Sequence, residues 1–253
     1  MAHVAKLSEH RSGGEERSSQ TSSSPTSSGA TQRPAPKGPG RLSWRAATAE
    51  VAARDPALAG VIARAGPVRL RAADPDGAFG ALVRAIAFQQ LAGAAASAIH
   101  GRVRALVDGP LTPEAVLALP EGALRGAGLS AAKTASIRDL AAHAVAGDVP
   151  LSRTGRMTDA EIVARLCEVR GIGPWTAEMF LLFELRRLDV WPIGDLGVRA
   201  GWGLAHGLDV APTPSELAAL GEPLRGVRSV AAWYCWQAVH IARDVARGPV
   251  RTP

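Results

Sequence analysis

The sequence has 253 residues, 47% of them hydrophobic and 21% charged, which is enough for one large domain or two small lobes with a real core. Its net charge of +6 favours a polyanionic partner. No apolar run approaches the roughly 20 residues of a membrane-spanning helix, and no apolar segment at the N-terminus could act as a signal peptide. These features exclude a membrane protein and predict a soluble protein of the cytoplasm.

Cysteine and histidine are too sparse for the common metal sites. Two cysteines, Cys167 and Cys235, exclude a disulfide framework, a four-thiolate zinc site and a four-cysteine iron–sulfur cluster. We expect both thiols to be buried, because free cysteine usually behaves as a small hydrophobic residue. The six histidines are scattered, with no pair at the spacing of metal ligands on one predicted helix. The sequence therefore predicts no zinc and no iron–sulfur cofactor.

The first part of the chain differs in composition from the rest. Residues 18–28 read SSQTSSSPTSS, and almost no large aliphatic residue precedes Trp44. Such a segment cannot bury a core. We therefore predict a disordered Ser/Pro-rich tail over residues 1–40 and a single helical domain over residues 41–253.

From Trp44 onward the pattern is helical, because alanine and leucine are abundant and runs of β-branched residues are short. The pattern predicts an all-α domain, with helices within residues 79–106 and 130–145. The stretch VRLR at 68–71 is the one candidate for a short strand. Signals for helix starts are Thr112 with Pro113, a capping box of Thr158 with Glu161, and a second box of Thr213 and Glu216 around Pro214.

Residues 158–187 combine a capped helix, a short break and a second helix. The break is Gly171–Ile172–Gly173, and the second helix begins at Pro174. The glycines allow a tight turn and the close approach of another backbone, while Pro174 suits the first turn of a helix. Free amides beside the positive end of a helix dipole can hold a phosphate. Any helical protein can use such a turn, so the turn alone is weak evidence of function.

Wider matches make the hairpin more specific. The segment GIGPWTAEMFLL at 171–182, followed by DVWPIGD at 189–195, resembles the helix-hairpin-helix (HhH-GPD) glycosylase superfamily in its DNA-3-methyladenine glycosylase II branch. The resemblance implies an all-α, two-lobed helical bundle with its active-site cleft between the lobes. The chain departs from the family at LRGVRS (224–229), where a PWR-type triplet is usual. Three further segments resemble the family in its order: 81–99, 128–137 and 228–237.

Asp195 is the predicted catalytic residue. In this branch an aspartate facing the base pocket follows the hairpin by about twenty residues, and Asp195 follows Trp175 by twenty. A carboxylate there would stabilise the oxocarbenium-like sugar and orient the attacking water. The alternative is a helix N-cap, because LGVRAGWGL after Asp195 reads as a helix. Asp189 and Glu178 are rivals for the catalytic role, although a connecting turn and an otherwise apolar helix favour structural roles for them.

The lysines bear on the type of reaction. Lyase members of the superfamily carry a nucleophilic lysine just after the hairpin, and Trp175 stands at that position. The chain has only three lysines, Lys6, Lys37 and Lys133, none of them on the hairpin. The sequence therefore predicts a monofunctional glycosylase that uses water as its nucleophile.

The resemblance also implies the remaining site residues. Aromatic faces can hold a flipped cationic base, at roughly 0.5–2 kcal/mol each. Core packing is the alternative for Trp191 and Trp202. The predicted base pocket comprises Trp175, Trp236, Met179, Trp191 and Trp202. The predicted DNA-binding residues are Gly171, Ile172, Gly173 and Thr176 at the hairpin, Gln90 and Leu91 as the inserted pair, and Lys133 and Arg199 at phosphates. The carbonyls of Cys167, Val169 and Ile172 are predicted to hold a monovalent cation.

The predicted function is the excision of alkylated purines, of the 3-methyladenine type, from damaged duplex DNA by a monomer without an iron–sulfur cluster. In a bacterium this enzyme would associate with the nucleoid. Two alternatives stay open: a non-catalytic helix-hairpin-helix DNA-binding protein, and a glycosylase of the same fold for deaminated or oxidised bases.

Overall fold

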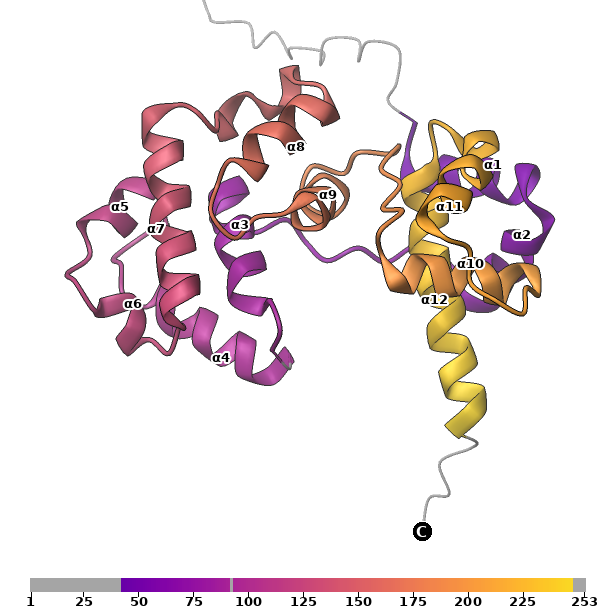
Figure 1. The fold of residues 1–253 in the computed structure, drawn as a ribbon, viewed down its shortest axis with the longest axis horizontal. Coiled ribbons are helices and arrows are strands. Elements are labelled where there is room, and N and C mark those ends of the chain that lie inside the picture. The colour runs from indigo at the N-terminus through magenta and orange to yellow at the C-terminus, as the bar shows by residue number, and fades with distance from the viewer. Residues whose placement is uncertain (1–41, 92, 248–253) are drawn as a thin grey trace, which may run out of the picture. The chain divides into compact units, whose positions relative to one another are not determined.

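The structure, a computed structural model, describes residues 42–91 and 93–247 (Figure 1). The prediction of a disordered tail over residues 1–40 lies outside these residues. The described chain forms twelve α-helices and two 3-10 helices, and no strand occurs within it. The elements are α1 (Trp44–Arg54), α2 (Pro56–Ala65), α3 (Gly77–Phe88), α4 (Gly93–Arg104), α5 (Pro113–Ala118), α6 (Ala123–Gly126), α7 (Ala131–Ala146), η1 (Leu151–Arg156), α8 (Asp159–Cys167), α9 (Pro174–Phe183), α10 (Leu196–His206), α11 (Pro214–Leu220), η2 (Glu222–Leu224) and α12 (Arg228–Arg247).

The helices pack in two groups, which are visible in Figure 1. The first lobe contains α3 to α9 with η1, and α3 contacts α4, α7, α9 and η1 within it. The second lobe is built from both ends of the described chain: α1 and α2 pack against α12, and α2 also packs against α10. The chain crosses from the second lobe to the first before α3 and returns after α9. This arrangement confirms the predicted all-α, two-lobed bundle.

The predicted helix starts are confirmed by their caps. The side chain of Thr112 accepts a hydrogen bond at the start of α5, where Pro113 is the first helical residue. Reciprocal capping boxes begin α8 at Thr158 and α11 at Thr213. Each cap satisfies backbone amides that have no partner inside the helix. These starts are local, which explains why the sequence alone predicts them.

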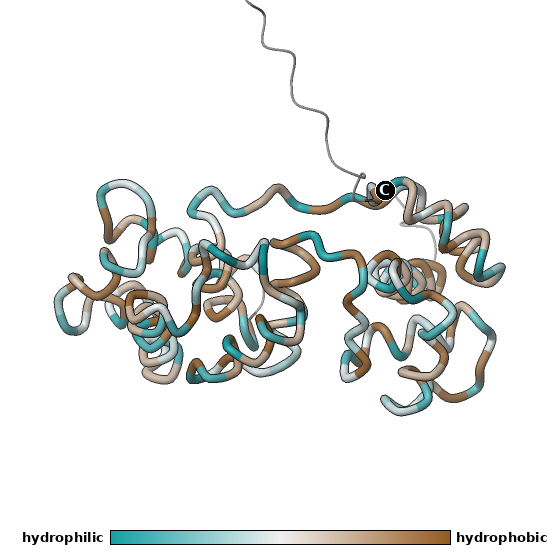
Figure 2. Tube along the Cα trace, turned by 90° about the horizontal axis from the view of Figure 1, so that it is seen from above, coloured by the Kyte–Doolittle hydropathy of each residue, from teal (hydrophilic) through white to brown (hydrophobic). Residues whose placement is uncertain are grey.

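Apolar side chains from both lobes form the core, and apolar and polar residues are interspersed along the tube of Figure 2. Along the described chain, no helix is both long and apolar enough to span a membrane. The backbones of α10 and α12 approach closely at Gly201, where a Cβ would overlap the carbonyl group of Cys235. The second lobe therefore needs a glycine at this crossing.

The predicted helices within 79–106 are confirmed as α3 and α4, and between them Gln90 takes a left-handed backbone conformation at φ 55°. Two other local predictions are wrong. Residues 68–71 form no strand; a strand needs a paired neighbour, and this stretch only connects α2 to α3. Cys167 is exposed at the end of α8, whereas Cys235 is buried as expected.

Candidate active site

A cavity of about 860 Å³ lies between the lobes. Its walls come from residues 69–71, from α3 and the residues that follow it, from α9, and from Asp195 and Trp236 of the second lobe. Most of the lining surface is apolar, although eight of the seventeen lining residues carry polar or charged side chains, and such a combination is typical of pockets that bind small molecules. The cavity is therefore the candidate site for an extruded base.

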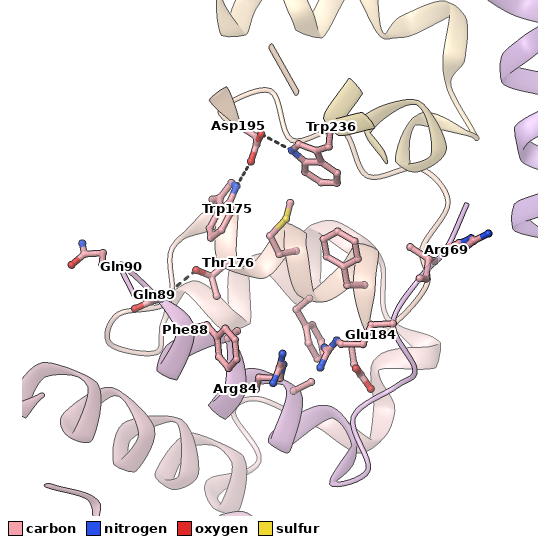
Figure 3. Close-up of a pocket in the computed structure, with 17 residues that line it drawn as sticks. Arg69, Arg84, Phe88, Gln89, Gln90, Trp175, Thr176, Glu184, Asp195 and Trp236 are labelled. Carbon is pink, nitrogen blue, oxygen red and sulfur yellow. Dashed lines mark hydrogen bonds between the residues drawn. The ribbon is translucent and has the colours of Figure 1, made fainter. Parts of the chain in front are cut away.

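Asp195 lies on the wall of this cavity and accepts hydrogen bonds from three donors, two of which, Trp175 and Trp236, are drawn in Figure 3. Its Oδ1 accepts hydrogen bonds from the Val198 amide at 2.8 Å and from the Trp236 indole Nε1 at 2.9 Å. Its Oδ2 accepts one from the Trp175 indole Nε1 at 2.6 Å. The residue is only 9% exposed. Asp195 thus caps α10, as the alternative interpretation predicted, and also presents Oδ2 at the pocket.

Close packing places Trp236 beside Asp195. The Trp236 ring stacks on Phe183, with 5.6 Å between ring centroids and 26° between planes. A Cβ at Gly197 would lie 2.8 Å from Cδ1 of Trp236, so the indole reaches Asp195 only because position 197 is glycine. The sequence analysis missed this role, because a glycine inside a helix carries no signal of what crosses it.

Asp189 has a structural role in the turn before the site. Both of its carboxylate oxygens accept hydrogen bonds from the Arg228 guanidinium, at 2.6 and 2.9 Å. Oδ1 also accepts one from the Gly226 amide at 2.7 Å. This bidentate pair ties the LRGVRS segment to the turn. As expected, Asp189 is no competitor of Asp195.

Glu178, the other rival carboxylate, lies on α9 but does not line the cavity. Burial, and secondarily the charge of Asp195, raise the pKa of Glu178 from 4.5 to about 7. The folded protein therefore binds this proton more tightly than the unfolded chain, so Glu178 makes stability fall as the pH rises from about 4.5 to about 7.

Replacing Glu178 by glutamine is expected to remove that dependence. The Glu178→Gln variant should be more stable than the wild type at about pH 8, and the difference should vanish below the unfolded pKa. Thermal unfolding measured across this pH range checks the prediction. Identical pH profiles for the two proteins would show that Glu178 ionises normally in the fold.

The predicted base-pocket residues fall into two sets. Trp175, Met179 and Trp236 line the cavity. Trp191 and Trp202 do not, so their assignment to the pocket is wrong. Trp191 is 7% exposed, and its indole donates to the Leu217 carbonyl at 2.8 Å. Trp202 is 4% exposed and packs edge-on against Trp191. Both rings fill the core of the second lobe instead.

The hairpin lies beside the pocket. Gly171 has φ 79° and faces Ser136 of α7 so closely that a Cβ there would collide with the hydroxyl group. Gly173 and Trp175 are exposed, whereas Ile172 and Thr176 are buried. The first amides of α9 have no acceptor inside the helix and lie at its positive end. An anion could therefore bind here.

The loop after α3 is joined to the hairpin. The side chain of Gln89 donates to the Gly171 carbonyl at 3.0 Å. The next two residues, Gln90 and Leu91, are exposed, and Gln90 lines the cavity. Leu91 is a large apolar side chain that is 41% exposed, in the loop after α3 and next to the lining residue Gln90. This position suits a residue that enters a DNA duplex.

Lys133 is not a free phosphate ligand. Its ammonium group donates to the carbonyls of Ala87 at 2.9 Å and Gln89 at 2.6 Å. Lys133 therefore binds the carbonyls at the C-terminal end of α3, a favourable place for a cation. We therefore expect a structural role for Lys133, and its contact with a phosphate stays a prediction. The other predicted cation, Arg199, donates from Nε to the Pro212 carbonyl at 2.6 Å, and its DNA contact stays a prediction.

The Lys133→Met variant separates the two roles of this lysine. Because it leaves two carbonyls unpaired, we expect it to lose about 1–3 kcal/mol of stability in urea unfolding. The dependence of duplex affinity on salt should be unchanged. A salt slope lower by about 1 would instead identify a phosphate contact.

Several lining residues have no counterpart in the sequence-based prediction. They come from the linker before α3, from α3 itself and from the end of α9, and their helical spacing is indistinguishable from that of core residues. The missed residues are Arg69, Leu70, Arg71, Ala81, Arg84, Ala85, Phe88, Gln89, Phe180, Phe183 and Glu184.

No group of three or more His, Cys, Asp or Glu side chains suited to a metal ion occurs among residues 42–91 and 93–247.

Known proteins share this architecture. Residues 83–225 match the family described as HhH-GPD superfamily base excision DNA repair protein. Over 164 residues the chain is 35% identical to DNA-3-methyladenine glycosylase 1 of Schizosaccharomyces pombe, covering 64% of this chain and 72% of the relative.

Solved structures agree. A DNA-3-methyladenine glycosidase from Bacillus halodurans superimposes with a TM-score of 0.71 at 35% identity, over 78% of this chain and 91% of that chain. The Schizosaccharomyces pombe 3-methyladenine DNA glycosylase in complex with abasic DNA superimposes with a TM-score of 0.68 at 31% identity, over 76% of this chain and 95% of that chain. The chain therefore belongs to the HhH-GPD superfamily of base excision DNA repair proteins.

Proposed function

We propose that this protein is a monofunctional DNA glycosylase that hydrolyses the N-glycosidic bond of alkylated purines, of the 3-methyladenine type, in damaged duplex DNA. One observation carries the proposal: the Asp195 carboxylate lies on the wall of an aromatic pocket, hydrogen-bonded to Trp175 in the first turn of the hairpin's second helix. The start of α9, which we expect to bind a phosphate, thus lies next to Asp195, which we expect to stabilise the sugar cation.

The pocket binds the base after its extrusion from the duplex. Unstacking a base costs a few kcal/mol, and a damaged or mispaired base costs less. The rings of Trp175, Trp236 and Phe183 offer electron-rich faces to a cationic purine. Leu91 enters the gap that the base leaves, with Gln90 beside it, which agrees with their exposure next to the pocket.

The chemistry needs one carboxylate. When the bond between C1′ and the purine nitrogen breaks, its electron pair goes to the base and neutralises the positive charge of the alkylated ring. Positive charge then develops on the deoxyribose, and the ionised Asp195 stabilises it more than it stabilises the neutral sugar. A water molecule adds to C1′ and loses a proton, which Oδ2 can accept because a carboxylate oxygen has two lone pairs and Oδ2 has one donor. The products are a free base and an abasic site.

The hairpin grips the DNA backbone. The free amides at the start of α9 bind a phosphate, with Gly171 and Gly173 allowing the strand to approach closely. In addition, the carbonyls of Cys167, Val169 and Ile172 in the turn between α8 and α9 would hold a monovalent cation. They belong to one tight turn, in which the Val169 carbonyl accepts the Ile172 amide at 3.1 Å. Carbonyl oxygens suit such an ion, which would add positive charge near the phosphate.

Release of free base tests the proposal. The purified protein is given methylated DNA and duplexes that contain hypoxanthine or 8-oxoguanine, and free bases are quantified. We expect release of methylated purines, leaving abasic sites, and no covalent adduct after borohydride treatment. Duplex binding without any release would support the non-catalytic alternative, and release of only the deaminated or oxidised base would support the other. The substrate places the enzyme in the cytoplasm, at the nucleoid if the cell is bacterial.

A further inference from the structure

The wall of the cavity away from Asp195 carries a guanidinium group without a hydrogen-bond acceptor in the described chain. Arg84 of α3 lines the cavity, and its Cζ lies 4.0 Å from the ring centroid of Phe88, one turn further along the same helix (Figure 3). The nearby carboxylates pair with other arginines, Asp76 with Arg104 at 2.8 Å and Asp74 with Arg71 at 3.9 Å. Arg84 is thus a cavity-lining cation with unused donors.

The surroundings make this group ready for a ligand. Burial, and then the charge of Arg71, lower the pKa of Arg84, and the charge of Asp74 opposes this shift only in part. A partly buried donor without an acceptor costs free energy that a ligand oxygen would restore. The Phe88 ring supports the guanidinium plane from one face, which reduces the freedom lost when the group binds.

The chemistry of purines identifies the matching oxygen. Guanine and its alkylated or deaminated relatives carry a carbonyl acceptor at C6, whereas adenine carries an amino donor there. A guanidinium can donate a hydrogen bond to the carbonyl, whereas it cannot form one with the amino group, because both groups are donors. We propose that Arg84 makes this enzyme prefer purines with a carbonyl at C6, such as 7-methylguanine and hypoxanthine, over 3-methyladenine. This inference rests on the proposed glycosylase function and adds a preference within its substrate class.

Two lesions of equal charge provide the comparison. 7-Methylguanine and 3-methyladenine are both cationic in DNA, so the loss of positive charge at position 84 would by itself change both release rates in the same direction. A change in the ratio of the two rates on mutation therefore reports a contact that differs between the two bases, as the C6 substituent does. Both lesions occur in the same methylated DNA, and their release rates can be measured together under single-turnover conditions. The Arg84→Met variant should release 7-methylguanine about 10- to 100-fold more slowly, because a charge-assisted hydrogen bond is lost. Its release of 3-methyladenine should be unchanged or faster.

Two further variants complete the experiment. Arg45 is exposed on α1 and does not line the cavity, so Arg45→Met makes the same change of charge and should leave the ratio of the two rates unchanged. Arg84→Lys keeps the charge but loses the planar pair of donors, and its ratio should lie between those of the wild type and Arg84→Met. Hypoxanthine in a defined duplex should follow 7-methylguanine.

The outcomes separate the claims. Equal slowing of both lesions by Arg84→Met, in a variant with a wild-type melting temperature, would overturn the preference. A shift of the ratio by Arg45→Met as large as that by Arg84→Met would also overturn it. If Arg84→Met does not fold, the Arg84→Lys ratio decides, and a wild-type ratio there would overturn the proposal. Failure of the wild type to release any purine would instead refute the proposed function, and this inference with it.

Discussion

The Asp195→Asn variant should release methylated purines about 10²- to 10³-fold more slowly than the wild type, and it should still fold and bind duplex DNA. Asparagine is nearly the same size and also caps helices, so α10 should begin as before. Its neutral side chain cannot stabilise positive charge on the sugar. Its amide also cannot accept a hydrogen bond at both positions, so either Trp175 or Trp236 loses its acceptor.

Single-turnover base release and duplex binding, measured on the same preparation, check this prediction. Asp209 lies in the exposed loop after α10, and Asp209→Asn makes the same charge change away from the cavity, so it should release base at the wild-type rate. Base release by Asp195→Asn at the wild-type rate would remove Asp195 from the mechanism.

The Gly201→Ala variant should lose about 3 kcal/mol of stability or more, because the added methyl group overlaps backbone atoms and not a movable side chain. The collision is with the carbonyl group of Cys235, so α10 and α12 must move apart. Since Asp195 caps α10 and α12 carries Trp236, base release should fall together with stability.

Urea unfolding measures the loss. Gly101 provides the matched control: it lies on an exposed face of α4, and a Cβ there would meet no atom within 4 Å. Gly101→Ala should be neutral or more stable by about 0.5–1 kcal/mol, because alanine is the better helix former. Equal stabilities for Gly201→Ala and the wild type would show that the two helices can separate at little cost.

Features that depend on neighbours in the chain were predictable from the sequence. Helix starts at Thr112, Thr158 and Thr213 are confirmed, because a cap and its amides lie within three residues of each other. The helix–turn–helix over 158–187 is confirmed for the same reason. The resemblance to the superfamily correctly predicted the family, and it directed attention to Asp195, whose catalytic role stays a prediction.

Side-chain partners over long distances were not predictable. Residue type alone does not distinguish the tryptophans, yet Trp191 and Trp202 lie in the core, whereas Trp175 and Trp236 line the cavity. The hydrogen bonds of Lys133 on α7 to two carbonyls at the end of α3 had no signal in the sequence either.

By itself, the sequence determined the helical class, the helix starts and the hairpin, because these depend on hydrophobic periodicity and on hydrogen bonds between residues a few positions apart. Only the tertiary structure decided which aromatic rings face the cavity, that Asp195 both caps α10 and receives two indole donors, and that Arg84 lines the opposite wall. These facts depend on the packing of segments separated by tens of residues, and close packing of side-chain shapes leaves no periodic signal in the chain.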